Sequence, residues 1–224
     1  MQVIRSKRKT LALVIGPDGS LTVRAPLRLP QSAIDAFVRD KSDWIRQKQT
    51  EAHQRSERCG RPPGLPYRFE SGEAFLYLGK SYPLELVARQ KGALIFDGTF
   101  KLKREIQPQA AKVFEAWYKA QARNLFAYRL AELSDQTGLN YVSLRLSSAR
   151  TRWGSCSSRG TISLNWKLIM APPEVIDYVI IHELAHVQEK NHSKSYWTLV
   201  ERLLPDYRLR RGWLKTNGLC LSWL

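Results

Sequence analysis

The sequence lacks any apolar run long enough to cross a membrane. A membrane-spanning helix needs roughly 20 apolar residues, and no stretch of the 224-residue chain approaches that length. The apolar run after the basic N-terminus, residues 11–15, is too short for a signal peptide and continues into Gly-Pro-Asp-Gly. We therefore expect a cytoplasmic protein with no membrane partner.

Acidic residues are also few. Only 20 Asp and Glu oppose 36 Lys and Arg, which gives a net charge of +16. Such a surface attracts polyanions, so nucleic acid is a candidate partner, although charge can also serve solubility alone. The basic residues are spread along the whole chain, and the three cysteines have no zinc-finger spacing. The sequence thus predicts affinity for phosphate without recognition of a base sequence.

The first part of the chain has the periodicity of short strands around a helix. Residues 9–25 alternate apolar and polar on both sides of Pro17-Asp18-Gly19, which is typical of a β-hairpin. Residues 31–58 have helical spacing, and residues 74–103 give short strands separated by turns that contain glycine. We expect an N-terminal, antiparallel β-rich lobe with one inserted helix over residues 1–105.

The second part, residues 106–224, turns largely helical. A long core helix is predicted over residues 107–136, and strands over residues 140–148 and 161–166. Further helices follow residue 172. The whole chain is therefore predicted to be an α+β fold, with both parts in one continuous compact unit. No pattern predicts an oligomeric state.

Histidine is scarce, yet three of the four histidines fall within residues 182–192. Pro172-Pro173 opens a predicted helix, on which His182 and His186 lie four residues apart and therefore on one face. Two imidazoles on one face suit a zinc ion. Glu183 lies beside that face, where its carboxylate could take a proton from a metal-bound water.

The third metal ligand has two candidates. His192 follows His186 at short range, and Glu201 lies on the next predicted helix. We favour His192. Three protein ligands would leave the fourth zinc position open for water, as in catalytic zinc sites.

Candidate substrate-binding residues surround this motif. The strand over residues 161–166 could pair with an extended substrate, and Asn165 could then hydrogen-bond it, or simply be a polar group at a strand end. Arg152, Tyr196 and Tyr178 are candidates for stabilising the charge that develops on the substrate oxygen.

Two sequence blocks carry a resemblance to a known family. RWGSCSSRGTISLNW and YVIIHELAHVQEKNHSKSYW, together with the N-terminal RKTLALVIGPDGSLTVRAP, resemble the YgjP-like metallopeptidase family, which is related to the SprT and WLM zinc proteases. The resemblance implies a zincin-like (mini-gluzincin) core, zinc bound by His182, His186 and His192, and Glu183 as the catalytic acid. The related proteases act on proteins attached to DNA.

The leading hypothesis is a zinc metallopeptidase that cleaves a protein or peptide, with substrates associated with nucleic acid as one option. One alternative is a metal-dependent nucleoside triphosphate pyrophosphohydrolase, although the sequence has no glycine-rich phosphate loop. Another is a nucleic-acid-binding protein with a structural zinc ion. Glu183 argues against this third hypothesis, because a structural site has no use for a carboxylate there.

Overall fold

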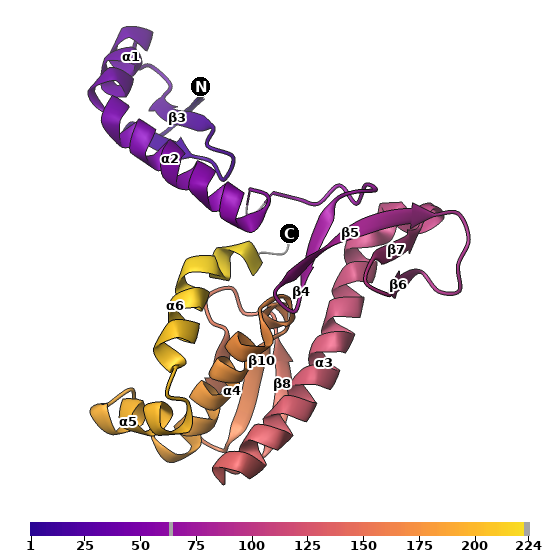
Figure 1. Cartoon of the computed structure of the whole chain (residues 1–224). Helices are drawn as coiled ribbons and strands as arrows, with labels where there is room; N and C mark the ends of the chain where they lie inside the picture. The colour runs from indigo at the N-terminus through magenta and orange to yellow at the C-terminus, as the bar shows by residue number, and fades with distance from the viewer. Residues whose placement is uncertain (63–64, 222–224) are drawn as a thin grey trace. The chain divides into compact units, whose positions relative to one another are not determined.

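The computed structural model describes residues 1–62 and 65–221 (Figure 1). The chain divides into two compact units, Met1–Pro66 and the part that begins at Tyr67. The sequence instead suggested a division at residue 105, which falls inside the second unit. No helix in the described ranges is long and apolar enough to cross a membrane.

The first unit is a small sheet with two helices. The predicted hairpin is confirmed, since β2 and β3 pair antiparallel. β1 pairs parallel with β3, so the sheet is mixed rather than antiparallel. The single predicted helix is two helices that meet at Lys41. The elements are β1 (Gln2–Ser6), β2 (Ala12–Ile15), β3 (Leu21–Pro26), α1 (Gln31–Asp40) and α2 (Ser42–Cys59).

The second unit begins with a four-stranded sheet in the order β4-β5-β7-β6. β5 and β7 run parallel, and the other neighbours run antiparallel. Its aromatic face packs on a long helix: the ring of Phe114 lies 4.4 Å from Phe75 and 5.2 Å from Phe100. This packing joins residues 67–103 to the long helix, which explains the absence of a boundary at residue 105. The strands are β4 (Ala74–Tyr77), β5 (Lys80–Val87), β6 (Leu94–Phe96) and β7 (Phe100–Lys103).

The long helix is α3 (Ala110–Thr137), which comes directly after the short 3-10 helix η1 (Arg104–Gln109). Buried residues recur at every fourth position from Ala110 to Leu130, so one stripe of the helix faces the core. The helix ends at Gly138, whose positive φ of 69° is the left-handed conformation that glycine adopts most easily. In Figure 1, α3 runs alongside α4 and the second sheet.

The second sheet has the order β8-β10-β9, with strands β8 (Ser143–Ser147), β9 (Gly154–Cys156) and β10 (Thr161–Asn165). β10 is paired on both sides, parallel with β8 and antiparallel with β9. It therefore cannot accept a substrate backbone, and the prediction that this strand pairs with a peptide is wrong. β9 is an edge strand of this sheet and contacts α4.

The helix that carries the histidines, α4 (Pro173–Gln188), is fixed on several sides. Arg129 of α3 makes two hydrogen bonds of 2.8 and 2.7 Å to Asp177 of α4. The β4–β5 turn donates from Leu78 and Gly79 to the carbonyls of η2, which precedes α4. The remaining elements are η2 (Trp166–Met170), α5 (Lys194–Leu203), α6 (Tyr207–Asn217) and η3 (Gly218–Leu221). The combination of these helices with small mixed sheets confirms the predicted α+β class.

Candidate metal centre

Three imidazoles converge at the end of α4. His182 and His186 lie one turn apart on the helix, which ends at Gln188, and the extended backbone at Glu189 turns the chain so that His192 comes back over them. The Nε2 atom of His192 lies 3.1 Å from that of His186 and 3.2 Å from that of His182. Among the residues that the structure describes, these three form the group of side chains able to hold a metal ion.

The spacing of the nitrogens fits a divalent ion. Zinc binds imidazole nitrogen at about 2.0–2.1 Å with tetrahedral angles, which separates two ligand nitrogens by about 3.3 Å. The observed separations of 3.1 and 3.2 Å match that value closely. Three neutral imidazoles also suit cobalt, nickel or copper, so the donor set alone does not select zinc. The residues therefore fit a metal site with three protein ligands.

Hydrogen bonds fix the rings of two histidines. The Tyr196 hydroxyl donates to the His182 carbonyl at 2.9 Å and lies 2.7 Å from His182 Nδ1, so Nδ1–H can donate to the same oxygen. His186 Nδ1 lies 3.0 Å from the carbonyl of Glu189. A proton on Nδ1 leaves the lone pair of Nε2 free for the metal, which is the usual role of such partners.

Glu183 is buried beside the histidines. Its side chain is 4 % exposed, and burial raises its pKa to about 8, although the charge of Arg152 partly opposes this shift. Gly154 of β9 lies against it, because a Cβ at that position would overlap the Glu183 carboxyl group. The Trp-Gly-Ser-Cys run thus supplies the one residue that leaves room for this carboxylate.

The surroundings favour the neutral form of His182 and of His192. Burial lowers the pKa of His182 to about 3, with further contributions from His186, His192 and Arg211. Burial, His186 and Arg211 also lower the pKa of His192. Neutral imidazole is the form that binds a metal.

Comparison with known proteins points in the same direction. A family model described as "YgjP-like, metallopeptidase domain" matches residues 9–217. The chain belongs to the YgjP-like metallopeptidase family. This confirms the resemblance seen in the sequence and, at the level of the family, a metallopeptidase that uses a divalent metal.

Individual relatives of this YgjP-like chain match only in part. The UTP pyrophosphatase of Escherichia coli (strain K12) is 28% identical over 68 residues, which cover 30% of this chain and 41% of that protein. The match thus spans about two fifths of the length of the curated relative. The zymogen of Pyrococcus abyssi abylysin, a metallopeptidase, is 26% identical with a TM-score of 0.37. The matched region covers 40% of this chain and 93% of abylysin. Jannalysin of Methanocaldococcus jannaschii, also a metallopeptidase zymogen, is 19% identical with a TM-score of 0.33. The matched region covers 38% of this chain and 92% of jannalysin.

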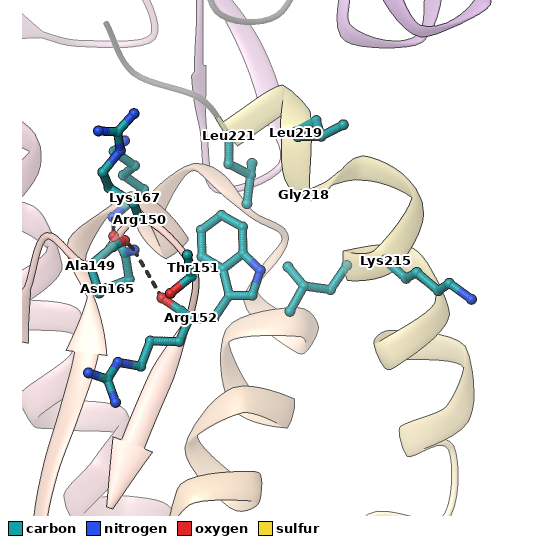
Figure 2. Close-up of a pocket in the computed structure, with 12 residues that line it drawn as sticks. Ala149, Arg150, Thr151, Arg152, Asn165, Lys167, Lys215, Gly218, Leu219 and Leu221 are labelled. Atoms are coloured by element: carbon teal, nitrogen blue, oxygen red, sulfur yellow. Dashed lines mark hydrogen bonds between the residues drawn. The ribbon is translucent and has the colours of Figure 1, made fainter. Parts of the chain in front are cut away.

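The three predicted substrate-binding residues have different surroundings. Asn165 is 3 % exposed; its amide donates to the carbonyls of Ala149 at 2.8 Å and Arg152 at 3.3 Å, and its oxygen accepts from Lys167 N (Figure 2). Its polar atoms are thus used to hold the loop before β9. Tyr196 is fully buried against His182. Arg152 is exposed, so it alone of the three is open to a ligand.

Two other candidates lie outside the centre. Glu201, the rival for the third ligand, forms an ion pair of 2.8 Å with Arg208 and does not belong to the histidine group. Cys156 is a free, half-buried cysteine. Burial raises the pKa of its thiol, which reduces its nucleophilic character near neutral pH.

Basic pockets border Arg152 on two sides. One, of about 400 Å³, is lined by Arg150, Lys167 and Lys215 with an apolar wall that includes Trp153 and Leu214 (Figure 2). The other, of about 490 Å³, combines arginines with hydroxyl groups, and its lining residues are Arg145, Arg152, Ser155, Cys156, Ser157, Arg159, Thr161 and Ser163. Neither pocket is lined by a carboxylate. This surface near the centre favours negatively charged ligands.

Sequence reasoning missed Arg211. Its guanidinium lies 4.7 Å from the centre of the Trp197 ring, and that ring stacks against His192 with centroids 5.6 Å apart. The only sequence signal is that Tyr207 and Arg211 are one helical turn apart, which says nothing of the metal site without the fold.

Proposed function

We propose that this protein is a zinc-dependent metallopeptidase, with zinc held by His182, His186 and His192 and with Glu183 as the general base. The observation that carries the proposal is the convergence of three Nε2 atoms beside a buried carboxylate. Membership of the YgjP-like metallopeptidase family supports the peptide bond as the target. When bound, zinc lowers the pKa of water and polarises a carbonyl group.

Each residue of the centre then has a defined task. Glu183 takes the proton of the attacking water and passes it to the leaving amine. Its pKa, raised by burial to about 8, brings it near the range in which a general base works best. Tyr196 and the Glu189 carbonyl orient His182 and His186.

The substrate would lie along β9 rather than β10. β9 has β10 on one side and pairs with no second strand in this sheet, and Glu183 of α4 lies against Gly154 on a face of β9. An extended peptide can add to such an edge through main-chain hydrogen bonds. The net charge of +16 favours substrates associated with nucleic acid, and the function is proposed to take place in the cytoplasm.

A second candidate is hydrolysis of nucleoside triphosphates to release pyrophosphate. Two observations favour it: the partial similarity to the UTP pyrophosphatase and the basic pockets around Arg152. The same water could attack phosphorus, and the arginines could bind the phosphates. A purely structural zinc site is disfavoured, because it would leave the buried carboxylate of Glu183 without a role.

The test compares wild type with Glu183→Gln, both loaded with zinc, on an unfolded protein with and without DNA, and on UTP. We expect wild type to cleave the protein and Glu183→Gln to lose about 10²–10⁴-fold in rate. Glu174→Gln, an exposed glutamate on the first turn of the same helix, is the matched control and should retain full activity. Activity on UTP alone would select the second candidate. Equal activity of wild type and Glu183→Gln on every substrate would refute both.

A further inference from the structure

We propose that Arg211 holds the negative charge that the substrate develops beside the three-histidine centre. The proposal rests on the proposed function in requiring a metal-activated water, but it applies to an attacked carbonyl and to an attacked phosphoryl group alike. In both reactions an oxygen gains negative charge, and a positioned donor that stabilises it supplies a large share of the rate.

Trp197 places Arg211 at the centre. The Trp197 ring stacks on His192 at 5.6 Å, with an angle of 23° between the rings, and lies 5.9 Å from the ring of His182. Arg211 packs on the same indole with its guanidinium carbon 4.7 Å from the ring centre. Tyr207, one turn earlier on α6, also stacks on Trp197, at 5.5 Å. This contact anchors α6 and sets the side of the helix from which Arg211 extends.

Arg211 has its charge available. Its neighbours on α6 are occupied, since Arg208 pairs with Glu201 at 2.8 Å and Arg210 pairs with Asp206 at 2.9 Å. Arg211 is exposed and makes no ion pair with any residue that the structure describes. A guanidinium stacked on an indole keeps its N–H groups free at the edge, where they can bind an anionic oxygen in pairs.

The charge of Arg211 affects the pKa of several groups in and around the centre. It contributes to the lowered pKa of His182 and His192, and it partly opposes the raised pKa of Tyr178 and Tyr196. Two of these groups are the proposed ligands His182 and His192, so Arg211 lies within electrostatic range of the centre. An oxygen that becomes negative in the same place would be stabilised by the same charge.

The other candidates are less well placed. Tyr196 is fully buried and its hydroxyl is bonded to His182, and Tyr178 is 5 % exposed. The charge of Arg152 affects the pKa of Glu183, whereas the charge of Arg211 affects the pKa of His182 and His192. Lys190 donates to the carbonyl of Val187 at 3.0 Å at the end of α4. Arg211 is therefore the exposed cation that Trp197 holds next to the histidines.

Anion binding tests the proposal without knowledge of the substrate. Inorganic phosphate is titrated calorimetrically into the zinc-loaded wild type, Arg211→Gln, Arg211→Lys and the same-helix control Arg208→Gln. We expect Arg211→Gln to weaken phosphate binding by about 10- to 100-fold, the usual range for a lost charge-assisted hydrogen bond. Arg211→Lys should retain part of the affinity, and Arg208→Gln all of it. Zinc content and melting temperature should not change.

Activity provides the second readout. On the substrate that wild type turns over, Arg211→Gln should lower kcat by about 10²–10³-fold, with a much smaller change in KM. Unchanged phosphate affinity in Arg211→Gln, an equal loss in Arg208→Gln, or loss of zinc would each overturn the proposal. If Glu183→Gln keeps full activity while Arg211→Gln loses phosphate binding, the proposed function fails and the role of Arg211 in holding an anion stands.

Discussion

Gly154 shows how one absent side chain positions the residue proposed as the base. The Glu183 carboxyl group occupies the space that a Cβ at residue 154 would need. We predict that Gly154→Ala displaces Glu183 and reduces the rate at least about 100-fold, because small misplacements of catalytic groups are costly. Overpacking should also lower stability by about 1–3 kcal/mol. Steady-state kinetics, zinc content and urea unfolding of the variant measure these effects.

The control for this variant is Gly212→Ala. A Cβ there meets nothing within 4 Å, and the residue lies inside helix α6, where alanine is favourable. It should keep full activity. Equal kinetics for Gly154→Ala and wild type would show that Glu183 has room to move or does not act as the base.

Tyr196 supports His182 through its hydroxyl. We predict that Tyr196→Phe weakens zinc binding by about 10- to 100-fold, as is typical when the partner of a ligand histidine is lost. The buried ring remains, so the fold should be preserved. Competition with a chromogenic chelator measures the affinity. Tyr128→Phe, at a tyrosine that is 64% exposed, is the control and should bind zinc normally. Normal zinc affinity in Tyr196→Phe would contradict the assigned role.

Parts of the candidate site could be predicted from sequence because they depend on local geometry. The spacing of His182 and His186 places both on one helical face, and the structure brings both rings together with His192. The surroundings of Asn165 and Tyr196 could not be predicted. The carbonyls to which the Asn165 amide donates belong to residues 16 and 13 positions away, and Tyr196 contacts His182, 14 positions away. Only the tertiary fold decides whether such polar atoms meet protein or substrate.

At the scale of elements, the β4–β5 turn secures the start of α4. Gly79 has a positive φ of 78°, and a Cβ there would lie 2.8 Å from Pro172 Cγ. We predict that Gly79→Ala costs about 2–4 kcal/mol, from the backbone strain and the clash together. Gly98→Ala has a similar φ of 97° but open space around it, so it should cost only the strain, about 1 kcal/mol. Urea unfolding compares the two, and equal losses would show that the Pro172 contact contributes nothing.

The ion pair between α3 and α4 is a second connection of elements. Arg129 and Asp177 form two hydrogen bonds, with side chains 26% and 16% exposed. We predict that Asp177→Ala destabilises the protein by about 1–3 kcal/mol, because Arg129 loses two charge-assisted hydrogen bonds. Asp43→Ala removes an ion pair whose carboxylate is 94% exposed, and its effect should stay below about 0.5 kcal/mol. Thermal unfolding of both variants tests this difference.

The pairing of elements was less predictable than their existence. Hairpins such as β2–β3 and β6–β7 depend on the residues of their turns, and the structure has both. The parallel pairs β1–β3 and β5–β7 join strands that are not consecutive. No local pattern encodes such a pairing, since it depends on which surfaces remain to be buried.

At the scale of the whole molecule, metal binding should appear as stability. A ligand that binds only the folded state stabilises it by RT ln(1 + [L]/Kd), about 4 kcal/mol at a thousandfold excess over Kd. We predict that zinc raises the melting temperature and that a chelator reverses the rise. His186→Ala should show neither effect. A melting temperature independent of zinc in the wild type would contradict the proposed metal centre.

The boundary between the two units at residue 66 could not be predicted from the sequence either. Residues 74–103 have the same strand periodicity as residues 9–25, so composition groups them together. The structure separates them because Phe75 and Phe100 pack on Phe114 of α3. Aromatic residues indicate a core, but they do not say which other segment completes it.

The hydrogen bonds of His182 to Tyr196 and of His186 to Glu189 have a consequence for how fast the centre takes up its ion. Both rings already stand at ligand spacing, so little of the chain has to become ordered when the ion arrives. Zinc fingers, by contrast, fold only as they bind. Uptake here should therefore be a rapid, single-step process with a small change in heat capacity, because almost no apolar surface is buried with the ion.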